Sequence, residues 1–377
     1  MRLARFVVAA VFVVALGTAA VADPLDPSQV VYQGAFKLSH SYDWGAYGAA
    51  YYPVGNPAPL PGEMTGSLKV YGHAWNHNMG EVAIPTTLGK KSLGATLGTL
   101  TQARDIAPPT NANPPYQPGA GGALEYLAGM DKLCYGANTG GGAGHGFCNP
   151  DGTSPQGPWV VAGQDQRRLG GAISEIAPAW GAANLPAGQV LITGFEWAPY
   201  GAGPTIVAYD PSDPAPGTAL PSTRLLAYSG ANPMTDWDRD DTWSGSAWLE
   251  AGADSAVVLL GRKDVTNMGG DAGAADDLKA WMLFFDPADL AAVVAGGNTY
   301  DPQPYAMIDM SAEIYSVQQF ESAAYDRERN LLFGIENNNG NETVHVWLIT
   351  EPALPIPEPA GLSLIGLTLL ALRRRRG

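Results

Sequence analysis

Short apolar segments alternate with turns over residues 23–350, and no stretch keeps the 3.6-residue period of a long amphipathic helix. Each segment has the length of a strand and is bounded by Gly, Pro, Asn or Asp, which is typical of strands joined by turns. The expected strands cover residues 30–38, 67–73, 189–195, 205–209, 256–261, 280–285, 331–335 and 343–349. This pattern predicts an all-β fold.

A loose repeat runs through the same region. A segment of small residues, usually ending in an aromatic residue, recurs at 48–52, 122–126, 245–248 and 322–325, with a shorter candidate copy at 171–173. A second apolar strand ending in glycine usually follows, and then a third. Repeated units of three or four strands predict a β-propeller, here with five to seven blades. The alternative is a β-sandwich, which would not explain the recurring unit.

The first expected strand, residues 30–38, precedes every copy of the repeat. We expect it to join the last blade and so to close the ring. Closure would remove exposed sheet edges, which otherwise invite aggregation.

The first 22 residues have the three-part layout of a secretory signal peptide. Arg2 and Arg5 precede an apolar stretch at 6–16, and the small residues Ala20 and Ala22 stand at the cleavage positions. The stretch is short for a membrane span, which needs roughly 20 residues. We therefore expect cleavage after Ala22 rather than a permanent anchor.

The C-terminal end also has three parts. Residues 351–359 form a Pro-rich spacer, and residues 360–377 combine an apolar run with a basic cluster, which we expect to form a short transmembrane helix. The arginines should remain on the cytoplasmic side. The residues that define the arrangement are Pro357, Glu358, Pro359, Arg373, Arg374, Arg375 and Arg376.

This order resembles the PEP-CTERM sorting signal of Gram-negative bacteria. The resemblance implies that an exosortase-type membrane enzyme recognises Pro-Glu-Pro and processes the protein while it is transiently inserted in the inner membrane. It also implies export to the cell envelope or beyond, in connection with exopolysaccharide and biofilm. The alternative is a simple tail anchor, which would not need the Pro-Glu-Pro motif.

The formal net charge of -15 narrows the range of partners. An acidic surface repels nucleic acid and anionic lipid head groups. We therefore expect no nucleic-acid partner, and membrane contact only through the C-terminal tail before processing.

Cys134 and Cys148 are the two cysteines of the chain, and a Gly-rich stretch separates them. An exported protein permits a disulfide. Closing a loop of about 15 residues would contribute roughly 3 kcal/mol in the chain-entropy model. We expect a disulfide here; a metal site that adds His145 lacks a clear fourth ligand.

Alternate aspartates in the run TDWDRDDTW suggest a cation site formed by Asp236, Asp238 and Asp240. The EF-hand pattern fails later in the run, because Asp241 stands where glycine is required. A looser calcium site remains a candidate, against a solvated acidic loop. We expect no other cofactor.

No catalytic motif such as GxSxG or HExxH is present. Four acidic residues close to aromatic residues are the candidates for a sugar-processing site: Asp43, Glu196, Asp236 and Glu321. The sequence therefore favours a non-catalytic binding or structural propeller over a propeller glycoside hydrolase or lyase, and the catalytic residues of the alternative stay unassigned.

Overall fold

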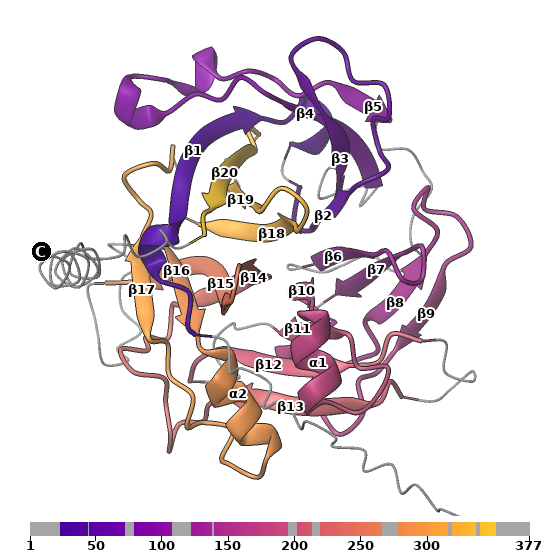
Figure 1. Ribbon diagram of the computed structural model, residues 1–377, viewed down its shortest axis with the longest axis vertical. Helices are drawn as coiled ribbons and strands as arrows, with labels where there is room; N and C mark the ends of the chain where they lie inside the picture. Colours follow the sequence, from indigo (N-terminus) through magenta and orange to yellow (C-terminus); the bar gives the residue numbers. More distant parts are fainter. Residues whose placement is uncertain are drawn as a thin grey trace, which may run out of the picture.

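The fold is a five-bladed β-propeller (Figure 1). The structure is a computed structural model that describes residues 23–351 apart from 44, 72–78, 108–121, 138, 195–201, 213–218, 266–277, 316–318 and 337–339. Its strands form five four-stranded antiparallel sheets around a central axis. The predicted all-β propeller is confirmed with five blades, and the sandwich alternative is wrong.

Blades 1 to 4 each take four consecutive strands. Blade 1 contains β2 (Ala49–Tyr52), β3 (Glu63–Tyr71), β4 (Met79–Pro85) and β5 (Asp105–Ala107). Blade 2 contains β6 (Gly122–Leu127), β7 (Lys132–Ala137), β8 (His145–Cys148) and β9 (Gln156–Trp159). Blade 3 contains β10 (Ala172–Glu175), β11 (Leu191–Gly194), β12 (Thr205–Tyr209) and β13 (Ser222–Ala227). Blade 4 contains β14 (Thr242–Ala251), β15 (Asp254–Asp264), β16 (Leu278–Phe285) and β17 (Ala306–Asp309).

Blade 5 closes the ring with strands from both ends of the chain. It contains β18 (Phe320–Asp326), β19 (Leu331–Glu336), β20 (Thr343–Ile349) and, at its outer edge, β1 (Val30–Lys37). The register of β1 on β20 runs from Val30 opposite Ile349 to Lys37 opposite Thr343. The predicted closure by the first strand is confirmed.

The innermost strands are β2, β6, β10, β14 and β18, which correspond to the five copies of the small-residue segment (Figure 1). They contain small residues because neighbouring blades come very close at the axis. A Cβ atom added to Gly245 would lie 3.0 Å from the backbone of Ser322 in the next blade. A Cβ atom at Gly48 would lie 3.1 Å from the backbone of Ala123. Steric crowding at the axis therefore explains the repeat.

The hydrophobic core lies between the blades rather than at one centre. The buried apolar side chains of the described residues form five clusters, one at each interface between adjacent blades. Trp248, for example, belongs to the cluster between blades 3 and 4, and Trp347 to the one between blades 4 and 5. Each blade therefore buries both of its faces, which explains why its central strands are apolar throughout.

Cys134 and Cys148 are both buried and are not bonded to each other, so the predicted disulfide is wrong. They lie on the neighbouring strands β7 and β8, where Cys148 is opposite Leu133 and Cys134 is opposite Phe147. Adjacent positions of a strand point to opposite faces of the sheet. Cys134 accordingly joins the cluster between blades 2 and 3, and Cys148 the cluster between blades 1 and 2.

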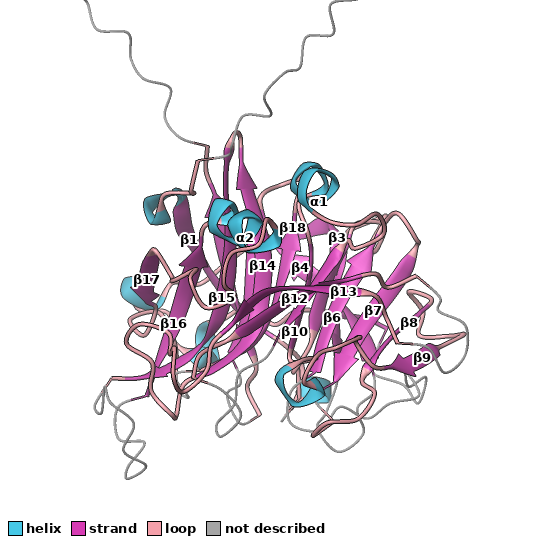
Figure 2. Ribbon diagram, turned by 90° about the horizontal axis from the view of Figure 1, so that it is seen from below, coloured by secondary structure: helices cyan, strands magenta, loops and turns pink. Residues whose placement is uncertain are grey.

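One face of the propeller carries the two described α-helices, α1 (Pro178–Asn184) and α2 (Pro287–Val294) (Figure 2). The described chain also begins and ends near the turn between β14 and β15. The amide of Ser255 donates to the carbonyl oxygen of Asp23 at 3.0 Å, and a Cβ atom at Gly252 would lie 3.9 Å from the side chain of Glu351. We call this side the terminal face.

Within the described part of the chain, no helix is long and apolar enough to cross a membrane. The expected transmembrane helix at 360–377 and the expected signal peptide at 1–22 lie outside the described residues.

Candidate functional site

An arginine from blade 5 reaches across the terminal face to two other blades. Arg327 follows β18 in the four-residue turn that leads to β19. Its Nη1 atom donates to Oε2 of Glu250 at 2.7 Å, and its Nε atom donates to Oε2 of Glu175 at 3.2 Å. Its Nη2 atom donates to the backbone oxygen of Glu175. Because Glu175 ends β10 and Glu250 lies near the end of β14, Arg327 ties blades 3, 4 and 5 together at the mouth of the central channel.

The same turn holds blade 1 through a second arginine. Arg329 donates through Nη2 to the hydroxyl of Tyr51 and, at 2.8 Å, to the backbone oxygen of Thr65. Its Nε atom lies 2.5 Å from Oδ2 of Asp326. The two arginines of this turn therefore extend in opposite directions, one to blade 1 and one to blades 3 and 4.

Glu125 adds a third carboxyl group to this mouth, from β6 of blade 2. Burial raises the pKa of Glu125 well above its usual value, and the nearby Glu175 raises it further. Burial also raises the pKa of Glu175, against the opposite effect of Arg327. The mouth therefore combines one guanidinium group with three carboxyl groups, and burial favours the neutral form of Glu125 most.

A cavity of about 620 Å³ opens beside this cluster on the terminal face. Its walls come from the β6–β7 turn, from α1 and from the segments that flank β11 and β12, and most of them are aliphatic. The side chains that form the apolar part include Met130, Ile176, Leu185, Pro186 and Val190.

The polar groups of the cavity are mainly hydrogen-bond acceptors. Glu175, Gln189 and Asp210 line it. Gln189 is 6% exposed, and its Oε1 atom has no hydrogen-bond partner among the described residues. A buried acceptor that lacks a donor of its own, as in Gln189, complements a ligand that brings hydroxyl or amine groups. The volume suits a ligand the size of one or a few sugar units.

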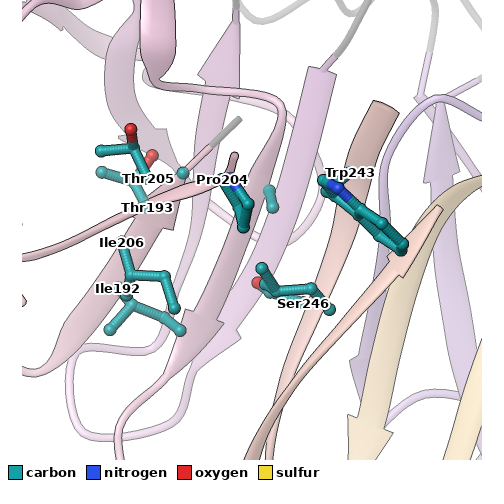
Figure 3. A pocket seen from close by; sticks show the side chains of 10 residues that line it. Ile192, Thr193, Pro204, Thr205, Ile206, Trp243 and Ser246 are labelled. Carbon is teal, nitrogen blue, oxygen red and sulfur yellow. The ribbon is translucent and has the colours of Figure 1, made fainter. Parts of the chain in front are cut away.

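A second, much smaller cavity lies between blades 3 and 4 (Figure 3). Thr205, Trp243 and Ser246 line it, and its volume is about 10 Å³. The hydroxyl of Thr205 and the indole N–H of Trp243 are buried without a partner among the described residues. A cavity of this size holds about one water molecule, so it is not a ligand site.

The structure separates the aspartates that the sequence grouped as a calcium site. Asp238 and Asp240 lie close to Asp264, the last residue of β15. Asp236 is not part of this group and instead accepts a hydrogen bond from Lys263 through its backbone oxygen.

The other acidic candidates do not converge on the mouth described above. Asp43 lies 2.9 Å from Nδ1 of His40 in the connection before β2, and Glu321 accepts a hydrogen bond from Gln319 at 2.7 Å near the start of β18. Glu196 lies outside the described residues, as do the sorting residues and the cleavage site at Ala20 and Ala22.

Arg327, Glu125, Glu175 and the cavity are not among the candidates that the sequence predicts. A signal for the carboxylates was present, because three copies of the innermost strand carry a glutamate towards their C-terminal end: Glu125, Glu175 and Glu250. These glutamates follow the first glycine of their copies by three, four and five positions, so the pattern indicates the end of the strand but not a shared register.

No family model matches the sequence, and no curated protein matches it. Among solved structures, the chain is similar to a candidate glycoside hydrolase from Parabacteroides distasonis ATCC 8503, with a TM-score of 0.41, 11% identity, and coverage of 88% of this chain and 94% of that chain. It is also similar to an auxiliary nutrient binding protein from Bacteroides thetaiotaomicron VPI-5482, with a TM-score of 0.34, 10% identity, and coverage of 87% and 75%.

Proposed function

We propose that this protein is an exported, envelope-attached propeller that binds a hydroxyl-rich ligand, a segment of extracellular polysaccharide, at the channel mouth and does not cleave it. The observation that carries the proposal is the sharing of Arg327 by Glu175 and Glu250. A glycosidase uses one carboxyl group as an acid and a second as a base or nucleophile, both facing the substrate. Here one guanidinium group occupies an oxygen of each of these two glutamates.

The adjoining cavity supports the choice of ligand. Glu175, Gln189 and Asp210 offer acceptors for sugar hydroxyl groups, and Leu185 and Val190 offer aliphatic surface for the C–H faces of a sugar ring. Pockets that bind small molecules commonly combine such apolar walls with a few fixed polar groups.

Export is the part of the proposal that rests on the ends of the sequence. Cleavage after Ala22 would leave Asp23 as the first residue, and the carbonyl oxygen of Asp23 accepts a hydrogen bond from the amide of Ser255. At the other end, Pro357-Glu358-Pro359 and the arginine cluster would direct processing by an exosortase-type enzyme. Because the described chain begins and ends on the terminal face, attachment through the C-terminal tail would turn the opposite face outwards.

A hydrolase is the second candidate, and the burial of Glu125 beside Glu175, which raises its pKa, is the observation that favours it. A buried carboxyl group with a raised pKa is the form that a general acid takes in a glycosidase. In that case Glu125 would protonate the leaving oxygen, and Glu175 or Glu250 would have to leave Arg327 to act as the second carboxylate.

One experiment separates the two candidates. The purified protein is incubated with the exopolysaccharide of the producing organism, and retention on the immobilised polymer and release of reducing ends are both measured. The proposal predicts retention without new reducing ends. Release of reducing ends that disappears in Glu125→Gln would establish the hydrolase instead. If the protein is not retained and releases no reducing ends, both candidates are refuted.

A further inference from the structure

The aspartates at the end of blade 4 opposite the terminal face form a compact, preorganised group. Asp238 and Asp240 lie in the segment before β14, and Asp264 ends β15. One carboxylate oxygen from each of the three lies within 4.8 Å of the others. Three carboxylates at this separation repel one another strongly unless a cation lies between them.

A fourth aspartate holds this group in place without belonging to it. Asp241 accepts the amide of Asp238 on Oδ2 at 3.1 Å and the amide of Asp264 on Oδ1 at 3.0 Å. Its single carboxylate therefore joins the segment before β14 to the end of β15. This contact brings the side chains of Asp238 and Asp264 to the same place before any ligand arrives.

Two basic residues of β15, Arg262 and Lys263, make hydrogen bonds close to this group. Nζ of Lys263 lies 3.2 Å from Oδ2 of Asp241 and also donates to the backbone oxygen of Asp236. Arg262 donates to the backbone oxygen of Asp240 at 3.2 Å and to the side chain of Gln319 at 2.8 Å. The hydrogen bonds of these two cations thus go to Asp241, to Gln319 and to backbone oxygens.

Asp238 provides an independent sign of a ligand. Asp238 is 1% exposed, and its Oδ1 atom accepts a hydrogen bond from the amide of Asp240 at 3.0 Å. Its Oδ2 atom is buried and has no hydrogen-bond partner among the residues that the structure describes. A buried carboxylate oxygen without a donor carries a large desolvation cost, and a bound metal ion offsets such a cost.

We propose that Asp238, Asp240 and Asp264 bind a divalent cation of the hard, oxygen-preferring class, Ca²⁺, with Asp241 as the positioning residue. Ca²⁺ takes six to eight oxygen ligands from carboxylates, carbonyl groups and water in flexible geometry, which suits three carboxylates on two different segments. Bound there, the cation would fix the start of β14 to the end of β15 on the face that points away from the chain termini.

Terbium luminescence provides the test, because Tb³⁺ replaces Ca²⁺ at oxygen sites and Trp237 adjoins Asp238 in the chain. Tb³⁺ is titrated into the purified protein with excitation of tryptophan, and Ca²⁺ or Mg²⁺ is then added as a competitor. We expect saturation at one ion per chain and displacement by Ca²⁺ at lower concentration than by Mg²⁺. Melting temperature is followed in parallel, and Ca²⁺ should raise it.

Three variants keep the result interpretable. Asp238→Asn and Asp240→Asn should each weaken the apparent affinity by at least about tenfold. Asp236→Asn is the matched control, because it removes the same charge from the same run. The backbone at this position has φ 58°, which asparagine tolerates. The affinity of this variant for the ion should match that of the unaltered protein. Circular dichroism establishes that each variant is folded.

Two results would overturn the proposal. One is the absence of saturable Tb³⁺ luminescence and of any Ca²⁺-dependent rise in melting temperature in the unaltered protein. The other is an equal loss of affinity in Asp236→Asn and in folded Asp240→Asn, which would reveal general attraction to an acidic loop.

Discussion

Arg327 and Glu250 belong to different blades, and yet Nη1 of Arg327 donates to Oε2 of Glu250 at 2.7 Å. The same guanidinium reaches Glu175 of a third blade. Few side chains of a propeller contact three blades, because each blade normally packs against its two neighbours. This contact brings charged groups of three blades together at the mouth, and Glu175 also lines the cavity.

Replacing Arg327 with methionine should destabilise the fold by about 2 kcal/mol, because the change leaves partly buried carboxylates without their donor. Urea unfolding followed by tryptophan fluorescence measures the loss. Arg167→Met is the control, since the side chain of Arg167 is 46% exposed and its partner Asp165 is two residues away. Such exposed pairs contribute at most about 1 kcal/mol. Equal effects of the two changes would contradict the role assigned to Arg327.

His145 should make the protein less stable in mild acid. Burial lowers the pKa of His145 to about 4 from 6.5, so the unfolded chain takes up the proton first as the pH falls. The contribution of His145 to stability is therefore complete above pH 6.5 and is lost as the pH falls towards 4. The full loss would be roughly 3 kcal/mol at 1.36 kcal/mol per pKa unit.

The variant His145→Gln isolates this effect, because glutamine does not titrate and can still bond to Thr193, whose hydroxyl lies 2.8 Å from Nε2 of His145. The free energy of unfolding of both proteins is measured from pH 7 to pH 4. The difference in the free energy of unfolding between the two proteins should narrow as the pH falls. A difference that is independent of pH would show that His145 has the same pKa in the folded protein as in the unfolded chain.

The two cysteines should behave as buried thiols. Burial raises the pKa of Cys148 to about 12, and it also raises that of Cys134, so both stay protonated and poorly nucleophilic at neutral pH. Ellman's reagent should therefore detect two thiols after unfolding in guanidinium and almost none before. An intact mass that rises on reduction of the exported protein would instead establish a disulfide.

Export and processing through the C-terminal motif are tested separately. Glu358→Ala removes the charged group of the Pro-Glu-Pro motif, so the precursor should accumulate in the membrane fraction while the fold of residues 23–351 stays unchanged. A blot of fractionated cells compares the variant with the unaltered protein and with Glu351→Ala, which removes a charge outside the motif. Normal maturation of Glu358→Ala would favour a simple tail anchor.

The innermost strands were the most predictable part of the fold, because crowding at the axis restricts them to small residues. Central strands such as β12 and β20 were also predicted with their observed bounds, since both of their faces are buried and their apolar runs are continuous. The outer strands β5 and β9 were not predicted at all, because they are short, largely exposed and at the edge of their sheets. Pro158 in β9 illustrates this, as proline is tolerated only where a strand needs no donor.

The charged mouth and the acidic group were harder to predict, because each is formed by residues far apart in the chain. Asp264 joins Asp238 only through the pairing of β14 with β15. Arg327 meets Glu175 only because the ring brings blades 3 and 5 to one axis. The disulfide prediction is wrong for a local reason: part of the Gly-rich stretch belongs to β8 rather than to a loop, and strand alternation separates the two thiols.

Binding at the cavity beside Arg327 is the central claim, and calorimetric titration with oligosaccharides prepared from the exopolysaccharide of the producing organism tests it most directly. Ala182 and Ala183 are both exposed on α1, but only Ala182 lines the cavity. Ala182→Trp should fill the cavity and weaken binding by at least about tenfold, whereas Ala183→Trp should bind like the unaltered protein. Equal binding by the two tryptophan variants, or no binding by the unaltered protein, would contradict the claim.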